Sequence, residues 1–255
     1  MKTVNKVIDL MEAFLINDND LGISELARIT GFNNSTTNRI AQTLTERGYL
    51  KQSGKRGKYS LGMKYFAFIS PLKRRIKFRQ LALPFMVKLC AEADDSVDLV
   101  SLEGIHCVSV EVVTTNNILK AVPAEGTAYE LYSSSGGKAA LAGYTDAQLD
   151  EYLKNTVLKK RTPHTITDMN ELKKQVLTVR QEGFAFDCEE TALHVHSVAA
   201  AIKGADGHVV GAIAVVGPKS RLTRAKMGEL APLIKESTLC ISREMGYRTQ
   251  DHLQT

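Results

Sequence analysis

One stretch of the chain, residues 21–62, constrains its fold more than any other. It reads LGISELARITGFNNSTTNRIAQTLTERGYLKQSGKRGKYSLG. Two segments with helical periodicity flank a turn at Gly31, and two short alternating segments follow them. This order of helix, turn, longer helix and two-stranded hairpin predicts a winged helix-turn-helix, a unit that reads DNA.

Local signals place the two helices. Ser24 lies at the start of the first helix and is expected to cap it with its hydroxyl, and Gly31 is a suitable left-handed stop. Asn33 or Asn34 is expected to cap the second helix. Ile40 and Leu44 are four residues apart, so they share one apolar face that should point toward the first helix.

The polar residues left outside form the predicted DNA-binding surface. Arg39 can donate two hydrogen bonds to guanine, and Asn38 or Gln42 can pair with adenine. Hydroxyls and the helix N-terminus can donate to phosphate, and a basic hairpin tip can follow the backbone or the minor groove. The predicted DNA-binding residues are Ser24, Asn34, Ser35, Thr36, Thr37, Asn38, Arg39, Gln42, Lys55, Arg56 and Lys58. The alternative is an ordinary helical hairpin with a solvated basic face.

The distribution of charge supports a polyanion partner at one end of the chain. Residues 1–80 hold 15 Lys and Arg against 6 Asp and Glu, a balance of +9, whereas the remainder holds 18 against 22, a balance of −4. No apolar run approaches the about 20 residues that span a bilayer, and the first residues lack a signal-peptide core, so a cytoplasmic protein is expected. The four cysteines form no CxxC pair and are expected to be reduced.

Beyond the hairpin, the pattern predicts an α+β fold. A first helix over residues 3–17 should cover the winged unit, and a helix from Met63 should break at Pro71. Strands are expected at 97–102, 107–113, 119–123, 184–186, 195–201 and 209–216, and helices at 72–93, 137–142, 146–154, 168–182 and 223–247, with Pro84 kinking or splitting the first of these. The predicted domains are a winged helix-turn-helix over 1–62, a helical linker over 63–80, and a mixed domain over 81–255 with a central antiparallel sheet.

Two polar clusters lie in the C-terminal part. Residues 133–138 read SSSGGK before a helix and could hold a carboxylate or phosphate, although a plain N-cap is the favoured interpretation. His194 and His196, two apart on a strand, would share a face and could ligate a metal with Cys188 or Glu190; a pair of edge-strand histidines is favoured instead. No set of nucleophile, base and orienting group occurs, so neither an enzyme nor a cofactor is expected.

The chain resembles the IclR family of bacterial and archaeal transcription regulators over nearly its full length. The matching stretches are STTNRIAQTL, GYL with KYSLG, LYSSSGGKAALA, RQEGFAFDCEE, VVGAIAVVGP and ISREMGY. The resemblance implies that the N-terminal domain binds a double-stranded operator as part of a homodimer, often a dimer of dimers. It also implies a GAF-like C-terminal domain that binds a small organic effector, often a carboxylic acid or aromatic compound from a catabolic pathway.

The resemblance further implies which residues hold the effector. They are Ser134, Ser135, Gly136, Asp187, Glu189, His196, Ser197, Ala214 and Val216. Ala214 and Val216 stand where the family often has serine, and losing two hydroxyls makes a small polar oxoacid a poor fit. A ligand with an apolar portion is expected there, its charged end on the serine loop or on His196. The expected function is a ligand-responsive DNA-binding regulator; a metal-responsive regulator using Cys188, Glu190, His194 and His196 is the alternative.

Overall fold

The computed structural model describes residues 2–15, 19–54 and 57–248. The chain forms two compact units, Met1–Arg75 and Ile76–Thr255. Each unit has its own hydrophobic core.

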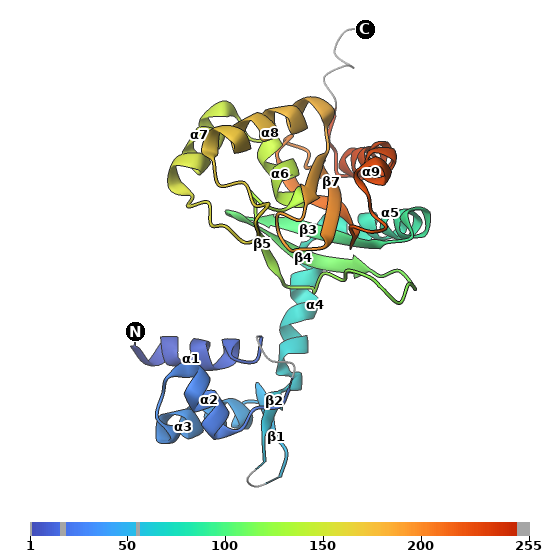
Figure 1. Cartoon of the computed structure of the whole chain (residues 1–255). Coiled ribbons are helices and arrows are strands. Elements are labelled where there is room, and N and C mark those ends of the chain that lie inside the picture. Colours follow the sequence, from blue (N-terminus) through green and yellow to red (C-terminus); the bar gives the residue numbers. More distant parts are fainter. Residues whose placement is uncertain (1, 16–18, 55–56, 249–255) are drawn as a thin grey trace. The chain divides into compact units, whose positions relative to one another are not determined.

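The N-terminal unit is a winged helix-turn-helix (Figure 1). Its elements are α1 (Lys2–Glu12), α2 (Ile23–Thr30), α3 (Asn34–Glu46), β1 (Leu50–Gln52), β2 (Tyr59–Leu61), the short helix η1 (Met63–Tyr65) and α4 (Phe66–Arg75). Helix α2 ends at Gly31, whose φ of 73° lies in the left-handed region, and α3 begins after Asn33, whose side-chain oxygen accepts the backbone N–H of Thr36 at 2.8 Å. The core between the helices and the hairpin contains Leu10, Leu26, Ile40, Ala41, Leu44, Leu50 and Tyr59.

Three expectations for this unit were wrong. Ser24 does not cap α2: Gly22 holds that position, and the carboxylate of Glu25 accepts the backbone N–H of Gly22 at 2.7 Å. The first helix ends at Glu12, although part of the predicted range, residues 16 and 17, lies outside the described residues. Helix α4 continues through Pro71 to Arg75, because a single proline removes one backbone hydrogen bond and the turns on either side retain theirs.

The C-terminal unit is built on a six-stranded antiparallel sheet in the order β5-β4-β3-β8-β7-β6. The strands are β3 (Ser96–Glu103), β4 (His106–Val113), β5 (Ala128–Glu130), β6 (Ala185–Cys188), β7 (Val195–Lys203) and β8 (Val209–Pro218). The predicted strand over 119–123 is absent from the described residues, and the third strand is Ala128–Glu130 instead. Pro123 has no N–H to give to a ladder, which disfavours a strand there.

Helices cover both faces of the sheet (Figure 1). One face carries α6 (Ser135–Ala142), α7 (Asp146–Asn155) and α8 (Met169–Glu182), and the other carries α5 (Lys77–Ala93) and α9 (Arg224–Glu244). Side chains alternate between the faces: Leu99 and Ile213 pack on the α5–α9 side, whereas Val100 and Ala212 pack on the α6–α8 side. Helix α5 is not split at Pro84; its break from α4 falls at Ile76. The predicted α+β architecture is confirmed.

Candidate functional sites

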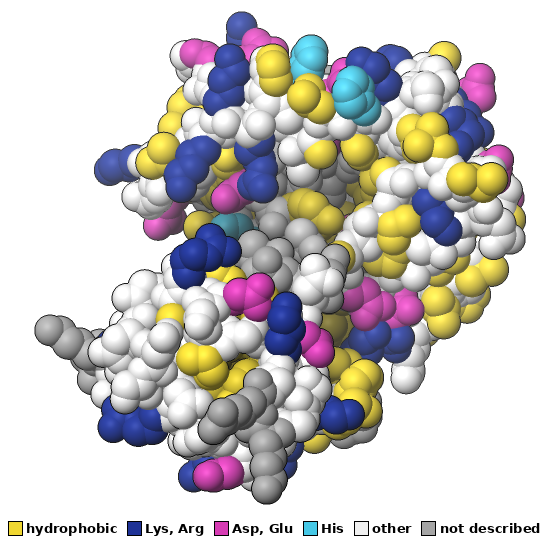
Figure 2. Space-filling model, turned by 60° about the horizontal axis from the view of Figure 1, so that its bottom comes forward, with side chains coloured by type: hydrophobic (Ala, Val, Ile, Leu, Met, Phe, Trp, Pro, Cys, Tyr) yellow, Lys and Arg dark blue, Asp and Glu magenta, His cyan; other side chains and the backbone are white. Residues whose placement is uncertain are grey.

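The outer face of α3 and the hairpin form the first candidate site. Ser35, Arg39 and Gln42 are exposed on α3, opposite its buried apolar stripe. A hollow of about 520 Å³ lies between the start of α2, α3 and the hairpin, and Ser24, Asn38, Gln42 and Lys58 all line it. Figure 2 brings this unit forward and shows its Lys and Arg side chains, in dark blue, among uncharged groups and a few Asp and Glu side chains, in magenta. The arrangement presents donors and acceptors on a convex helix beside a hairpin, which suits a DNA groove.

The remaining predicted DNA-binding residues divide into three groups. Asn34 and Thr36 lie in the first turn of α3, where side chains can reach phosphate. Thr37 does not reach the surface: it is fully buried, and its hydroxyl donates to the carbonyl of Asn33 at 3.0 Å, so its place in the predicted set was wrong. Lys55 and Arg56 lie outside the described residues.

One ion pair restrains the hairpin. The ammonium of Lys58 lies 3.4 Å from the carboxylate of Glu25, at the start of α2. The backbone hydrogen bond from Gly22, and then Lys58, hold the pKa of Glu25 below its usual value. Lys58 is therefore oriented across the hollow, with exposed donors left for a phosphate oxygen.

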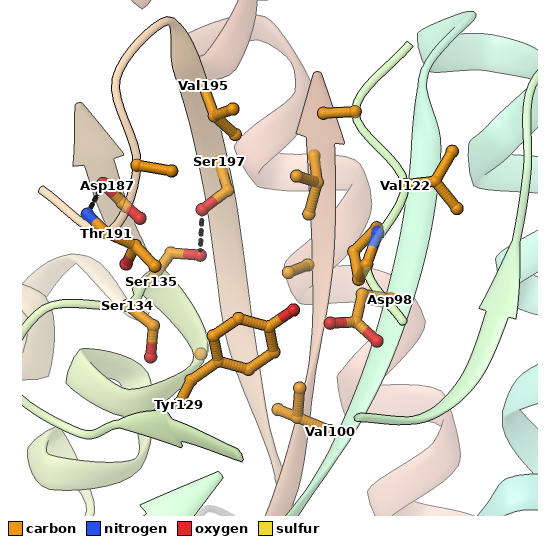
Figure 3. Close-up of a pocket in the computed structure, with 16 residues that line it drawn as sticks. Asp98, Val100, Val122, Tyr129, Ser134, Ser135, Asp187, Thr191, Val195 and Ser197 are labelled. Atoms are coloured by element: carbon orange, nitrogen blue, oxygen red, sulfur yellow. Dashed lines mark hydrogen bonds between the residues drawn. The ribbon is translucent and has the colours of Figure 1, made fainter. Parts of the chain in front are cut away.

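The second candidate site is a cavity of about 290 Å³ on the α6 face of the large sheet. Its lining residues are Asp98, Val100, Ala121, Val122, Pro123, Tyr129, Ser134, Ser135, Gly136, Asp187, Thr191, Ala192, Val195, Ser197, Ala214 and Val216 (Figure 3). Strand register brings distant residues together here, since Asp98 on β3 pairs with Ala214 on β8, and Ser197 on β7 pairs with both Val216 and Asp187. Seven of the residues that the resemblance implied, Ser134, Ser135, Gly136, Asp187, Ser197, Ala214 and Val216, thus line one cavity.

The serine loop, residues 133–138, forms one end of this cavity. Ser134 is the N-cap of α6, and its hydroxyl oxygen accepts the backbone N–H of Gly137 at 3.1 Å. The hydroxyls of Ser135 and Ser197 are 2.7 Å apart and hydrogen-bonded (Figure 3). Gly137 must be glycine, because a Cβ there would lie 2.4 Å from the Cα of Leu131. The loop is therefore both a helix cap and a polar wall of the cavity.

Asp187 holds the turn that follows β6. One oxygen of its carboxylate accepts the backbone N–H groups of Glu190 at 2.7 Å and Thr191 at 3.4 Å. Next to it, the buried ammonium of Lys138 donates to Glu190 at 2.5 Å and to Gln175 at 3.2 Å. Burial raises the pKa of Asp187 and of Glu190, and Lys138 opposes the rise in both. Much of the hydrogen-bonding capacity of Asp187 is thus used in fixing the turn.

Asp98 and Tyr129 are cavity residues that the sequence did not single out. The Asp98 side chain is 3% exposed and accepts the hydroxyl of Ser109 at 2.6 Å, and burial raises its pKa to about 7. Burial, and then the charge of Asp98, raise the pKa of Tyr129 to about 12. A signal for Asp98 existed, since an acidic residue interrupts the apolar strand sequence VDLV.

Two predicted effector residues lie elsewhere. His196 precedes Ser197 in β7 and so faces the opposite side of the sheet, where its Nδ1 lies 2.8 Å from the carbonyl oxygen of Leu222. Glu189 does not line the cavity; its carboxylate accepts the backbone N–H of His194 and the ammonium of Lys219, each at 2.8 Å. The hydrogen bond from Lys219 is the largest cause that lowers the pKa of Glu189 to about 2.

The metal-site alternative is overturned by the same geometry. His194 precedes β7 with a φ of 65° and an exposed side chain, so it does not share a strand face with His196. The carboxylate of Glu190 is paired with Lys138, which leaves on one face of the sheet only Cys188 and His196, partners in the ladder and too few to hold a metal ion. Within the described ranges, no group of three or more His, Cys, Asp or Glu side chains is placed to hold a metal ion.

A winged helix-turn-helix unit joined to an α+β unit that contains a cavity is an arrangement typical of DNA-binding transcriptional regulators. Residues 3–54 match the IclR helix-turn-helix domain, and residues 72–243 match the C-terminal domain of the bacterial transcriptional regulator IclR. The chain belongs to the IclR family and is a DNA-binding transcriptional regulator.

Individual relatives match along almost the whole chain. It is 28% identical over 246 residues to the HTH-type transcriptional regulator KipR of Bacillus subtilis (strain 168), covering 96% of this chain and 98% of KipR. It is 25% identical over 245 residues to the transcriptional repressor IclR of Escherichia coli (strain K12), covering 94% and 89%. The crystal structure of the Thermotoga maritima IclR superposes with a TM-score of 0.82 at 28% identity, covering 97% and 100%. Across the described part of the chain, no helix is long and apolar enough to cross a membrane.

Proposed function

We propose that this regulator binds an operator through α3 and the hairpin, and that a small organic effector in the cavity changes that binding. The observation that carries the proposal is the cavity itself. It combines apolar walls with a few buried hydroxyls and carboxyls, which is the composition typical of a small-molecule site. An IclR homologue from Microbacterium hydrocarbonoxydans with the same fold, at a TM-score of 0.80 and 21% identity, was solved in complex with 4-hydroxybenzoate. That complex supports a small effector for the fold and does not identify the effector of this chain.

The roles of individual residues follow from their places. Arg39 and Gln42 would read base edges, and Ser35 with the N-terminus of α3 would contact phosphate. In the cavity, Ala214 and Val216 would contact an apolar portion of the effector, since neither carries a hydrogen-bonding group. An effector changes operator affinity only if it binds with different affinity to the DNA-bound and the DNA-free protein. The resulting change in operator affinity is commonly about 5- to 150-fold.

The test combines an operator titration with a variant that fills the cavity. Fluorescence anisotropy with the promoter fragment of the regulator's own gene should show binding about 10³-fold tighter than to random duplex. A compound that stabilises the protein against heat should shift operator affinity in the wild type and should not do so in Ala214→Phe, whose ring occupies the cavity.

Ala147→Phe is the matched control, because Ala147 is exposed on α7 and the same change there leaves the cavity open. The proposal fails if no promoter fragment is preferred over random DNA, or if Ala214→Phe responds to the compound as the wild type does.

We further infer that the chain self-associates, as a two-fold symmetric homodimer or as a dimer of such dimers. Supporting this, the apolar side chains of Met63, Phe66 and Leu72 on η1 and α4 are 76%, 63% and 61% exposed. Contiguous exposed apolar side chains of this size in a soluble protein typically mark a protein–protein contact. A two-fold pair would present two copies of α3 to an operator with two half-sites.

A further inference from the structure

The charges of the cavity wall disfavour one ligand class that the family resemblance implies, a carboxylic acid. Two carboxyl groups, Asp98 and Asp187, line the cavity, and none of its described lining residues is Lys, Arg or His. Lys138 lies nearby, but its ammonium is already bonded to Glu190 and Gln175. A simple carboxylate ligand would therefore lie beside two acids, and among the described lining residues only hydroxyls and the N-terminus of α6 could offset its charge; Arg161 acts on Tyr129 but does not line the cavity.

Asp98 is the acid with hydrogen-bonding capacity left for a ligand. Asp187 accepts two backbone N–H groups, whereas the hydroxyl of Ser109 is the one hydrogen-bond donor to the Asp98 carboxyl among the described residues. A carboxylate offers about four acceptor sites, so most of those of Asp98 are unused. Its side chain is 97% removed from solvent and extends into the cavity beside Tyr129 (Figure 3).

The opposite wall fixes the length and character of a suitable molecule. Ser197 lies on β7 and Asp98 on β3, with β8 between them, so these polar ends are separated by two strand spacings of about 4.8 Å each and by an offset of two residues along the strands. Ala214 and Val216 form the floor between the two ends, and Val100 adds an apolar wall. The cavity thus offers an acceptor at one end, hydroxyls at the other, and an apolar middle.

We propose that the effector carries a protonated amino group that binds Asp98, with its apolar body over Ala214 and Val216. This inference rests on the proposed function and names the chemical class of its ligand. An ammonium supplies the counter-charge that Asp98 lacks when it is ionised and so favours the ionised form, and its N–H groups donate to the unused acceptor sites. A neutral hydroxyl could donate one hydrogen bond but could not offset the charge, and Asp98 thereby becomes the residue that selects the ligand class.

The test uses a fragment library built in matched triplets, in which one apolar body carries an aminomethyl, a hydroxymethyl or a carboxylate group. Ligand-observed NMR with full-length protein detects binding, and cavity binders are those lost in Ala214→Phe. We expect the amines to predominate among cavity binders. Asp98→Asn, which preserves size, should weaken them about tenfold or more and leave the alcohols within about threefold.

Asp150→Asn, at an exposed acid on α7, is the matched control and should leave all three classes unchanged. Asp98→Ser is the second variant if the asparagine protein does not fold. Cavity binding by carboxylates but not by amines, or amine affinity that survives both Asp98 variants, would overturn the inference while leaving effector control intact. A library in which no member of any class is lost in Ala214→Phe would count against the cavity as an effector site altogether.

Discussion

At the scale of single residues, Asp98 is a buried acid whose ionisation lowers the stability of the folded chain. Its pKa is about 7 in the folded chain against a usual value of 3.8, because burial disfavours the charged form. Between these pH values the folded state holds more protons than the unfolded state, so stability falls as pH rises from about 4 to 7 and then levels off. We expect Asp98→Asn to remove this loss of stability, worth at most about 4 kcal/mol, when unfolding by urea is measured across this pH range.

The comparison between wild type and Asp98→Asn isolates this group together with its coupling to Glu125, whose charge also raises the pKa of Asp98. Burial also raises the pKa of Asp187, Glu190 and Asp95, but those carboxyls are present in both proteins and their contributions cancel in the difference. A difference in unfolding free energy that stays constant from pH 4 to 8 would show that Asp98 is solvated or paired in the folded state, contrary to the structure.

At the scale of elements, α3 has one buried face that packs in the core and one exposed face that we propose reads DNA. Arg39 is exposed and Ile40 beside it is buried, so Arg39→Ala should leave thermal stability unchanged. We expect it to weaken operator binding by about 1–3 kcal/mol in anisotropy titrations and to weaken random DNA much less, because guanine contacts carry the specificity. Arg47→Ala, an exposed arginine just after α3, removes the same charge and is the control. Equal losses on operator and random DNA for Arg39→Ala would mean that Arg39 contacts phosphate only.

The elements that the sequence predicted well are those whose ends are determined locally. Gly31 and Gly183 both take the left-handed conformation that ends a helix, and Asn33 and Thr223 both accept a backbone N–H as caps. The short strand Ala128–Glu130 was missed, because three residues carry too little alternation and pairing with β4 decides their conformation. The break placed at Pro71 was wrong for a related reason, since neighbouring turns outweighed one local preference.

The candidate effector site could be predicted only in part, because its walls come from strands that pair over long sequence separations. The pairing of Asp98 with Ala214 joins β3 to β8, and no local pattern announces it. The alternation rule, by contrast, could have excluded one assignment from the sequence alone. His196 and Ser197 are adjacent in one strand and cannot both face the same cavity.

At the scale of the whole molecule, self-association should determine operator affinity. One winged unit contacts one short half-site, and a pair contacts two half-sites with the second contact made intramolecular, which commonly adds about 10²- to 10⁴-fold. Phe66→Glu places a charge among exposed apolar side chains of α4 and should shift the protein toward monomer in sedimentation velocity.

The half-sites of such an operator should lie one helical turn, about 34–36 Å, or a multiple of that distance apart. Phe66→Glu should lose most of its affinity for an operator with two half-sites and should bind a single half-site as the wild type does. Val157→Glu is the control, since Val157 is 75% exposed in the C-terminal unit. If Phe66→Glu sediments as the wild type does, the contact between copies lies elsewhere on the chain. If it becomes monomeric yet keeps its affinity for the paired site, each winged unit reads DNA independently, and an effector must then act within a single chain.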